Sequence, residues 1–321
     1  MKKILTLFTT FIVTATAFVG FGESTQVKAD DQTPVVTVGT SLTSSQRQGT
    51  IDTLTKALNG GNYKTITITG SDLVKYLNPS GDNFTDSSGV WSSAMIQKTS
   101  AGSGINVQIL DYNGKDNITT ITQNQYKNAA LTAGISDANI YVTSAIPIDG
   151  SGALAGVYAA YAKQGDALNQ KQINVAQDEM NTLSGITQAN KNKDGYTDSQ
   201  LNNAVAGAKS DMAKIGNNVS DSQIRDIVNN QIKINHLGDT INNNQKQQII
   251  NVLIQVRDSG ALKNGNFKQQ ASALSDNIQK NAKGIFDKLN TQENRNFLQQ
   301  IWDSIVNFFS GLFGGAIILN K

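Results

Sequence analysis

The chain contains no cysteine, one histidine and three prolines among its 321 residues. Without cysteine the protein has no disulfide bonds, no thiolate metal ligands, no cysteine nucleophile and no cysteine-linked lipid anchor. The single histidine, His236, is the one imidazole that a Ser-His hydrolase could use as its base. It stands near an expected helix end, where the helix dipole favours a cationic ring and Gly238 offers a C-cap. We therefore interpret His236 as a helix-end residue and predict no catalytic residues.

An excess of charge of either sign is also missing. The chain has 27 Lys and Arg against 25 Asp and Glu, and residues 1–29 hold three of the lysines and one glutamate, so the remainder has a net charge of zero. Basic residues form no long run, and this pattern argues against a nucleic-acid partner, whose phosphates attract basic surfaces. The abundant polar residues are Asn, Gln, Ser and Thr, which suit either glycan handling or a neutral solvated surface.

The N-terminus has the pattern of a secretory signal. Lys2 and Lys3 precede an apolar stretch over residues 4–21, and Val27-Lys28-Ala29 presents small residues two apart before Asp30. The stretch is short and rich in threonine for a transmembrane helix. We predict a signal peptide over 1–29 and an extracellular protein, and the lack of cysteine suits a Gram-positive exterior.

The remaining chain changes character near residue 164. Before it, strand-like and helix-like segments alternate, with a period-two strand over 63–69 and capping boxes at Thr43 and Thr122. After it, only helical periods follow, two of which start with capping boxes at Thr197 and Ser220. We predict an α+β protein: an α/β-like domain with a small mixed sheet over 30–163 and an all-α helical bundle over 164–290. A C-terminal amphipathic helix and apolar tail are expected over 291–321.

Three stretches resemble a known family: "GTSLTSSQRQ" from Gly39, "SSAMIQKTSAGSGINVQI" from Ser92 and "NAALTAGISDANIYVTSAIPIDGSGALAGVYAAY" from Asn128. They are similar to the secreted, YpuA-like family of Gram-positive bacteria known as domain of unknown function 1002. The resemblance implies a location and a lineage, but no activity, cofactor or catalytic residue. At Ile148–Gly152 the chain departs from the Val-Ser-Gly type of turn usual in that family, so no chemistry is transferred to this turn.

The third stretch contains a glycine pattern typical of phosphate sites. Gly150, Gly152 and Ala155 spell G-x-G-x-x-A, but the motif closes the α/β half where a dinucleotide-binding unit would open it. Ser151 between the glycines lacks the glycines at 149 and 153 that a nucleophile elbow requires. We interpret Gly150 and Gly152 as a structural turn from a buried strand into a closely packed helix, and we predict no nucleotide and no cofactor.

Two further patterns partly match known kinds of site. Residues 190–201 begin like a calcium loop, but Leu201 stands where the bidentate glutamate belongs, so we favour a polar turn and predict no metal site. A glycan hydrolase would need two carboxyl groups about 5 to 10 Å apart. Its candidate carboxylates in the first half are Asp72, Asp82, Asp86, Asp111 and Asp116.

The C-terminal segment has an apolar face that must be covered, because leaving nine large apolar side chains in water costs on the order of 15 to 25 kcal/mol. The face consists of Phe297, Leu298, Ile301, Trp302, Ile305, Val306, Phe309, Leu312 and Phe313. It is expected to dock on the helical bundle, on another copy or partner, or on a membrane surface.

These observations favour a secreted, cell-envelope-associated protein that acts by binding rather than by catalysis. Its expected partner is a cell-envelope component, a membrane surface, or a second copy bound through the C-terminal helix. Two alternatives stay open, a cell-wall glycan hydrolase using the loop carboxylates and a membrane-surface scaffold anchored by the C-terminal helix.

Overall fold

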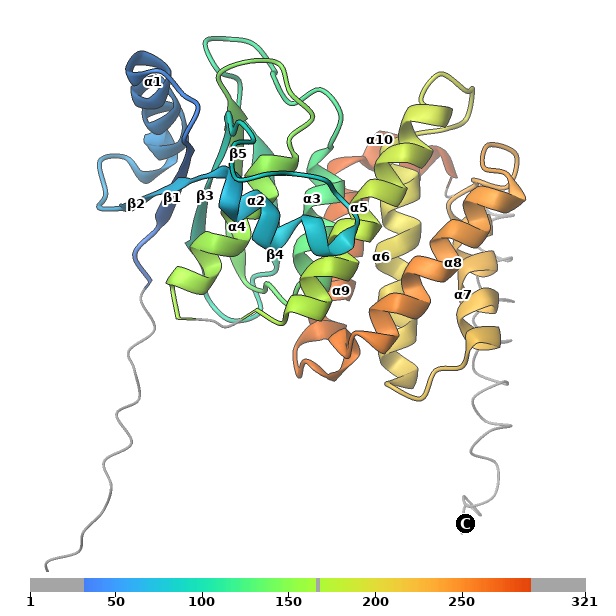
Figure 1. The fold of residues 1–321 in the computed structure, drawn as a ribbon. Helices are drawn as coiled ribbons and strands as arrows, with labels where there is room; N and C mark the ends of the chain where they lie inside the picture. Colours follow the sequence, from blue (N-terminus) through green and yellow to red (C-terminus); the bar gives the residue numbers. More distant parts are fainter. Residues whose placement is uncertain (1–31, 166–167, 290–321) are drawn as a thin grey trace, which may run out of the picture. The chain divides into compact units, whose positions relative to one another are not determined.

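A computed structural model describes residues 32–165 and 168–289 (Figure 1). The predicted signal peptide over 1–29 and the predicted apolar face from Phe297 to Phe313 lie outside these ranges. Within the described ranges, no helix combines the length and the apolar character that crossing a membrane demands.

Five strands form one mixed sheet in the order β2-β1-β3-β5-β4. Strand β3 runs antiparallel to both of its neighbours, whereas β1 pairs in parallel with β2 and β4 pairs in parallel with β5. The strands are β1 (Val35–Gly39), β2 (Lys64–Ile68), β3 (Ser92–Lys98), β4 (Ile105–Ile109) and β5 (Ala138–Ser144). The period-two segment forms edge strand β2, in which Ile68 is buried and Lys64, Thr65 and Thr67 are exposed.

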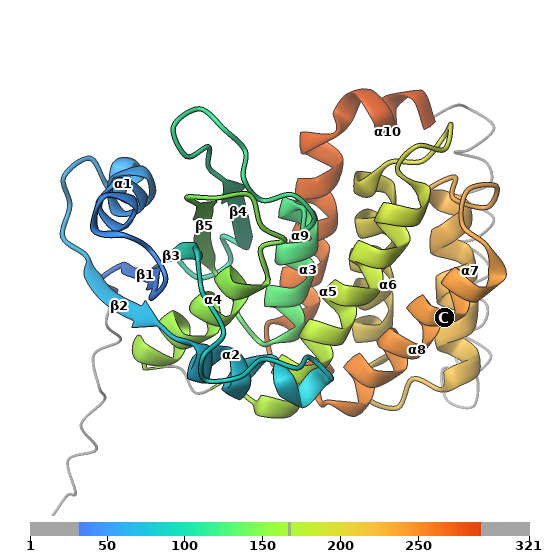
Figure 2. The ribbon, with the colours of Figure 1, turned by 45° about the horizontal axis from the view of Figure 1, so that its top comes forward.

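Helices cover both faces of the sheet, and alternate residues of each central strand point to opposite faces. On one face, Val36, Met95 and Tyr141 pack with Leu54 of α1 (Ser44–Thr55). On the other face, the strand residues between them pack against α4 (Ser151–Lys163) and α3 (Gln123–Thr132). Figures 1 and 2 show α1 separated from α4 by the sheet. The central strands β1, β3 and β5 are therefore largely buried on both faces.

The second half of the described chain is helical, as Figure 2 shows. The longer helices are α5 (Gln170–Asn190), α6 (Asp198–Ile215), α7 (Asp221–Ile234), α8 (Asn243–Asp258) and α9 (Phe267–Asn281). The shorter elements are α2 (Gly70–Tyr76), α10 (Lys283–Leu289) and the 3-10 turns η1 (Lys56–Leu58), η2 (Asn78–Ser80) and η3 (Ala261–Lys263). A mixed sheet followed by helices confirms the predicted α+β fold class.

One apolar core joins the sheet to the first layer of these helices. It contains Val35 of β1 and Ile278 of α9, together with Met180 from the first half of α5. A second core lies among the second half of α5 and helices α6, α7 and α8, and includes Leu183 and Leu253. Helix α5 thus contributes to both cores, and it packs against α3.

The helix starts follow the predicted capping chemistry. Thr43, Thr122 and Ser220 each form a complete capping box, in which side chain and backbone of the cap and third helical residue exchange hydrogen bonds. Thr197 accepts from the backbone N–H of Gln200 through its hydroxyl. The capping box predicted at Thr197 is incomplete, because the Gln200 side chain accepts from the Thr197 hydroxyl and not from its backbone N–H. All four caps nevertheless satisfy a donor that a helix start leaves unpaired, so these starts are fixed locally by the sequence.

Candidate functional site

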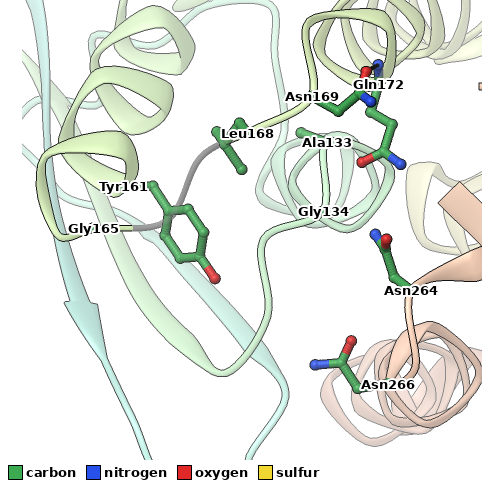
Figure 3. Close-up of a pocket in the computed structure, with 9 residues that line it drawn as sticks. All are labelled: Ala133, Gly134, Tyr161, Gly165, Leu168, Asn169, Gln172, Asn264 and Asn266. Atoms are coloured by element: carbon green, nitrogen blue, oxygen red, sulfur yellow. Dashed lines mark hydrogen bonds between the residues drawn. The ribbon is translucent and has the colours of Figure 1, made fainter. Parts of the chain in front are cut away.

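A polar hollow of about 360 Å³ lies where α3 and α4 end and α5 begins (Figure 3). Figure 3 shows the Tyr161 ring on one side and the amides of Gln172 and Asn264 on the other, with Gly134 between them. We call this space the amide hollow. Its lining residues are Ala133, Gly134, Tyr161, Gly165, Leu168, Asn169, Gln172, Asn264 and Asn266.

The end of α3 shapes the back of the amide hollow. Gly134 has a φ of 92° and ends α3 with a pair of hydrogen bonds, from its own N–H to Leu131 O and from the Ile135 N–H to Ala130 O. A Cβ at Gly134 would lie 3.0 Å from Gln172 Oε1 and 3.3 Å from Asn264 Nδ2. The missing side chain therefore lets two amides from distant parts of the chain approach the same backbone.

Three of the amides have hydrogen-bonding capacity left over. Among the described residues, the side-chain amides of Gln172, Asn264 and Asn266 have no hydrogen-bond partner. Asn169 differs, because its Oδ1 caps α5 by accepting from the N–H groups of Lys171 and Gln172 at 2.9 and 3.4 Å. Each unpartnered amide offers two N–H donors and one carbonyl acceptor to a molecule in the hollow.

The loop that carries Asn264 and Asn266 is held against the sheet half by Asp137. The Oδ1 atom of Asp137 accepts from Gln270 Nε2 at 2.7 Å and from the Gly104 N–H at 3.0 Å. Gln270 is 2% exposed and lies in the first turn of α9. These bonds connect the start of α9 with the residues just before β4 and β5. The two asparagines are thereby held at a fixed distance from Gly134.

A buried ion pair holds the helices behind the amide hollow. Lys209 Nζ of α6 and Glu179 Oε1 of α5 lie 2.5 Å apart, and both side chains are fully buried. Thr132, beside the hollow on α3, donates its hydroxyl proton to Glu179 Oε2 at 2.5 Å. Lys209 also donates to the carbonyl oxygen of Asn128 on α3 at 2.9 Å. One lysine and one carboxylate thus connect α3, α5 and α6 at a fixed spacing.

Burial and charge around this pair shift the pKa values of Lys209 itself and of the neighbouring Tyr158. Burial lowers the pKa of the Lys209 amine, while the negative charge of Glu179 acts in the opposite direction. Burial raises the pKa of the Tyr158 hydroxyl well above its ordinary value, and the charge of Glu179 raises it further. Tyr158 therefore stays protonated, and the pair acts as a structural connection inside the fold.

The amide hollow is chemically suited to a neutral polar ligand. Among its described lining residues, Tyr161 has the one ionisable side chain, a phenol that is 6% exposed. A ligand with hydroxyl and amide groups exchanges its hydrogen bonds to water for bonds to the three unpartnered amides. The structure describes no group of three or more acidic, histidine or cysteine side chains arranged for a metal ion, here or elsewhere in 32–165 and 168–289.

The structure places Gly150 in the turn before α4 and Gly152 in the first turn of α4. Gly150 is the N-cap of α4 with a φ of 105°, and its carbonyl accepts the Tyr126 hydroxyl proton at 2.6 Å. A Cβ at Gly152 would lie 2.9 Å from Ser92 Oγ, so this glycine lets the helix approach β3. From sequence we expect the strand to reach Ile146 and the helix to start at Ala153, whereas β5 ends at Ser144 and α4 starts at Ser151.

The expectation for the end of α7 is wrong in one detail. His236, not Gly238, adopts the left-handed conformation, with a φ of 53°. The His236 N–H donates to Lys233 O, and the Leu237 N–H donates to Ile232 O. Leu237 is fully buried behind this turn. We attribute the left-handed position at His236 to the burial of Leu237, which the preference for glycine does not reveal.

Residues 190–201 do not gather their oxygen atoms around one point. Asn190 is buried and donates to Ile186 O, whereas Asp194 is exposed. Asp198 instead accepts the hydroxyl proton of Thr122 at 2.9 Å and the amide proton of Asn202 at 2.9 Å. Burial raises the pKa of Asp198, and these hydrogen bonds oppose the shift. The carboxylate joins the starts of α3 and α6.

The five loop carboxylates have separate local roles. Asp72 caps α2 by accepting from the N–H and hydroxyl of Thr69, Asp86 accepts from Ser71, and Asp116 accepts from the Ile118 N–H. Asp111 is exposed. Asp82 accepts from Gln177 Nε2 at 3.2 Å. It lies near Asp149 and Asp178, two carboxylates that the sequence did not single out.

Sequence reasoning also missed the amide hollow. A glycine at the end of a helix-like segment, such as Gly134, predicts a helix end, but nothing in the spacing of Gln172 and Asn264 connects them with it or with each other. The Asn264-Gly-Asn266 turn is a local signal, and it predicts a turn rather than a site.

Comparisons with known proteins give a family and one relative. The family model described as "Protein of unknown function (DUF1002)" matches residues 38–274. A Bacillus subtilis (strain 168) protein called "Uncharacterized protein YpuA" is 33% identical over 153 residues, which cover 47% of this chain and 50% of the relative. The match thus spans about half the length of that relative. No solved structure matches the chain.

Proposed function

The chain belongs to the family described as "Protein of unknown function (DUF1002)", a description that names no activity, and we propose a function from its own geometry. The protein is exported, stays associated with the cell envelope and binds an uncharged glycan segment in the amide hollow without changing it chemically. The observation that supports this proposal best is the set of unpartnered amides of Gln172, Asn264 and Asn266 around one space.

The size and polarity of the amide hollow favour a small neutral sugar unit. A volume of about 360 Å³ lies at the low end of the range for ligand pockets, roughly 300 to 1,000 Å³. An N-acetylated sugar presents hydroxyl donors and acceptors together with an amide, and side-chain amides can pair with both. The Tyr161 ring adds an apolar face beside them. Binding therefore uses hydrogen bonds between neutral groups.

The contents of the hollow favour binding over catalysis. Proton transfer in glycan cleavage uses carboxyl groups on both sides of the bond, and the lining side chains that the structure describes are amides, a phenol and two aliphatic groups. The proposed role is therefore recognition. Export and envelope association are supported by the sequence pattern of residues 1–29 and by the apolar pattern from Phe297 to Phe313.

Calorimetric titration of the chain starting at Asp30 with N,N′-diacetylchitobiose tests this function. We expect saturable binding, and weaker binding of cellobiose, which lacks the acetamido groups. Replacing one amide, in Asn264→Ala or Gln172→Ala, removes a hydrogen bond between neutral groups and should weaken binding by about 2- to 10-fold.

The matched control is Asn244→Ala, which removes an exposed amide from the first turn of α8. It should leave the affinity unchanged. Equal affinities for the three variants, or no binding of the disaccharide by the unmodified chain, would contradict the proposal.

A further inference from the structure

A second pocket lies at the other end of α4, where the N-terminus of this helix meets the start of β3. Its volume is about 300 Å³, and it is chemically unlike the amide hollow. We call it the Trp91 pocket. It is lined by Leu73, Phe84, Ser88, Gly89, Val90, Trp91, Ser92, Ile148, Asp149, Ser151 and Gly152.

The walls of the Trp91 pocket are largely apolar and include an indole whose position is set by a glycine. A Cβ at Gly89 would lie 2.1 Å from the Trp91 ring, so the ring lies directly over the Gly89 backbone. Phe84 and Ile148 supply further apolar surface and are only partly buried. A flat apolar group entering the pocket can therefore contact aromatic surface.

The floor of the pocket holds a hydroxyl without a partner. Ser92 is 2% exposed, and its Oγ makes no hydrogen bond. This oxygen lies 2.9 Å from the position that a Cβ on Gly152 would occupy, and both residues line the pocket. A buried polar atom left unpaired costs free energy, and a ligand with a donor or acceptor at this depth removes that cost.

The rim of the pocket carries a carboxylate with one oxygen available. Asp149 Oδ1 accepts from the N–H and the hydroxyl of Ser151, both at 3.1 Å. Its Oδ2 has no hydrogen-bond partner among the described residues, and Asp149 is exposed. A positively charged donor in the pocket can bind this oxygen without breaking the turn that Oδ1 stabilises.

Two more carboxylates make the surroundings negative. Burial raises the pKa of Asp82, the hydrogen bond from Gln177 opposes this, and the charge of Asp149 raises the pKa further. Burial also raises the pKa of Asp178, and the charge of Asp82 adds to the shift. Asp82 is therefore close enough to both Asp149 and Asp178 for their charges to repel its own. A cation relieves this repulsion, whereas an anion adds to it.

We infer that the Trp91 pocket binds an organic ammonium ion with a flat apolar face. The apolar face packs against Trp91 and Phe84, the ammonium group pairs with Asp149 Oδ2, and Ser92 Oγ is satisfied at the floor. Aromatic surface and carboxylate act together here, because both attract a positive charge. This inference concerns a site and a ligand class separate from the proposed glycan binding, and either can fail alone.

Three probes of similar shape and different charge test it: phenethylammonium, 2-phenylethanol and phenylacetate. Trp302→Phe leaves Trp91 as the single indole, whose fluorescence reports binding. We expect affinities in the order cation, alcohol, anion, with at least about a 10-fold ratio between the first and the last. Asp149→Asn keeps the acceptor for Ser151 and should reduce the preference for the cation over the alcohol by about 3- to 5-fold.

Gly152→Ala is the second variant, and it should weaken the binding of all three probes because its methyl group occupies the floor near Ser92 Oγ. Asp52→Asn, an exposed carboxylate on α1, is the control and should change nothing. Equal affinity for the three probes, no response of Trp91 fluorescence, or an unchanged order in Asp149→Asn would each overturn the inference.

Discussion

Single buried residues determine whether the helices behind the amide hollow keep their positions. Lys209 and Glu179 are both completely buried, and each leaves an isolated charge if the other is removed. An isolated buried charge costs more than the pair contributes, because water no longer solvates it.

Lys209→Met should therefore destabilise the protein by about 3 to 5 kcal/mol, and Glu179→Gln should also destabilise it substantially. The double variant should be less destabilised than the sum of the two, since no unpaired charge remains in it. Urea denaturation of the four proteins measures this. Additive effects that are each below about 1 kcal/mol would show that the pair does not connect α5 and α6 as described.

The carboxylates around Asp82 make the stability of the fold depend on pH, and the direction of this dependence is defined. Their pKa values are raised in the folded state, so the fold gains stability when they are protonated and loses it as the pH rises through the raised values. Asp82→Asn keeps the acceptor for Gln177 but removes one charge.

In Asp82→Asn the pKa of Asp178 should fall, because the charge of Asp82 is one cause of its upward shift. The stability of this variant relative to the natural chain should increase from pH 4 to pH 7, by less than about 1 kcal/mol since both groups are partly exposed to water. Carbon NMR titration of the aspartate side chains measures the pKa. An unchanged Asp178 would contradict the placement of these groups.

At the residue level, the sequence revealed turns more readily than it revealed sites. Gly134 after α3 and Gly150 before α4 are identifiable as turn residues, because a left-handed backbone conformation favours glycine. The amides of Gln172 and Asn264 were not identifiable, since their meeting depends on how α5 and α9 pack and not on local spacing. The same holds for Asp149 and Asp82.

Among the elements, helix α4 owes its position to a glycine. A Cβ at Gly156 would lie 2.5 Å from Thr37 Oγ1, which itself exchanges hydrogen bonds with the Ala94 backbone between β1 and β3. Gly185, in the middle of α5, has open space around its Cβ position.

Gly156→Ala should therefore destabilise the fold by about 1 to 3 kcal/mol through overpacking. Gly185→Ala should stabilise it by about 0.5 to 1 kcal/mol, because alanine is the better helix former and nothing obstructs it. Thermal denaturation of both variants compares the two sites. A stabilising Gly156→Ala would mean that α4 does not approach β1 closely.

The local part of the fold was predictable from sequence and the non-local part was not. Capping boxes placed the starts of α1, α3 and α7, because the bonding groups lie within four residues. Strand order was not accessible, since β3 pairs with β1 and β5 across long loops that carry no register signal. The polar alternation of β2 indicated a half-exposed strand, but not its place at the edge.

At the scale of the whole molecule, the sheet and the first layer of helices share one apolar core, and the amide hollow lies between them. The predicted division into domains at residue 163 remains a prediction, as do export and envelope attachment. Export and envelope attachment depend on residues 1–29 and 291–321, which lie outside the described ranges.

The attachment prediction can be tested in a Gram-positive host by cell fractionation. The full chain should be exported and recovered with the envelope, whereas deletion of residues 291–321 or Trp302→Asp should shift it to the medium. The deletion removes the apolar face, and the aspartate places a charge within it, so the apolar attachment is lost. Gln300→Ala, on the polar side of the same sequence pattern, is the control. Equal envelope retention of the full and truncated chains would contradict attachment through this segment.

The most direct test of the central claim is an NMR titration of the side-chain amides with N,N′-diacetylchitobiose. Glycan binding in the amide hollow predicts that the NH₂ signals of Gln172, Asn264 and Asn266 shift together with increasing sugar and saturate at the same concentration. Signals of these three amides that stay unmoved, while the sugar binds elsewhere or not at all, would contradict the account.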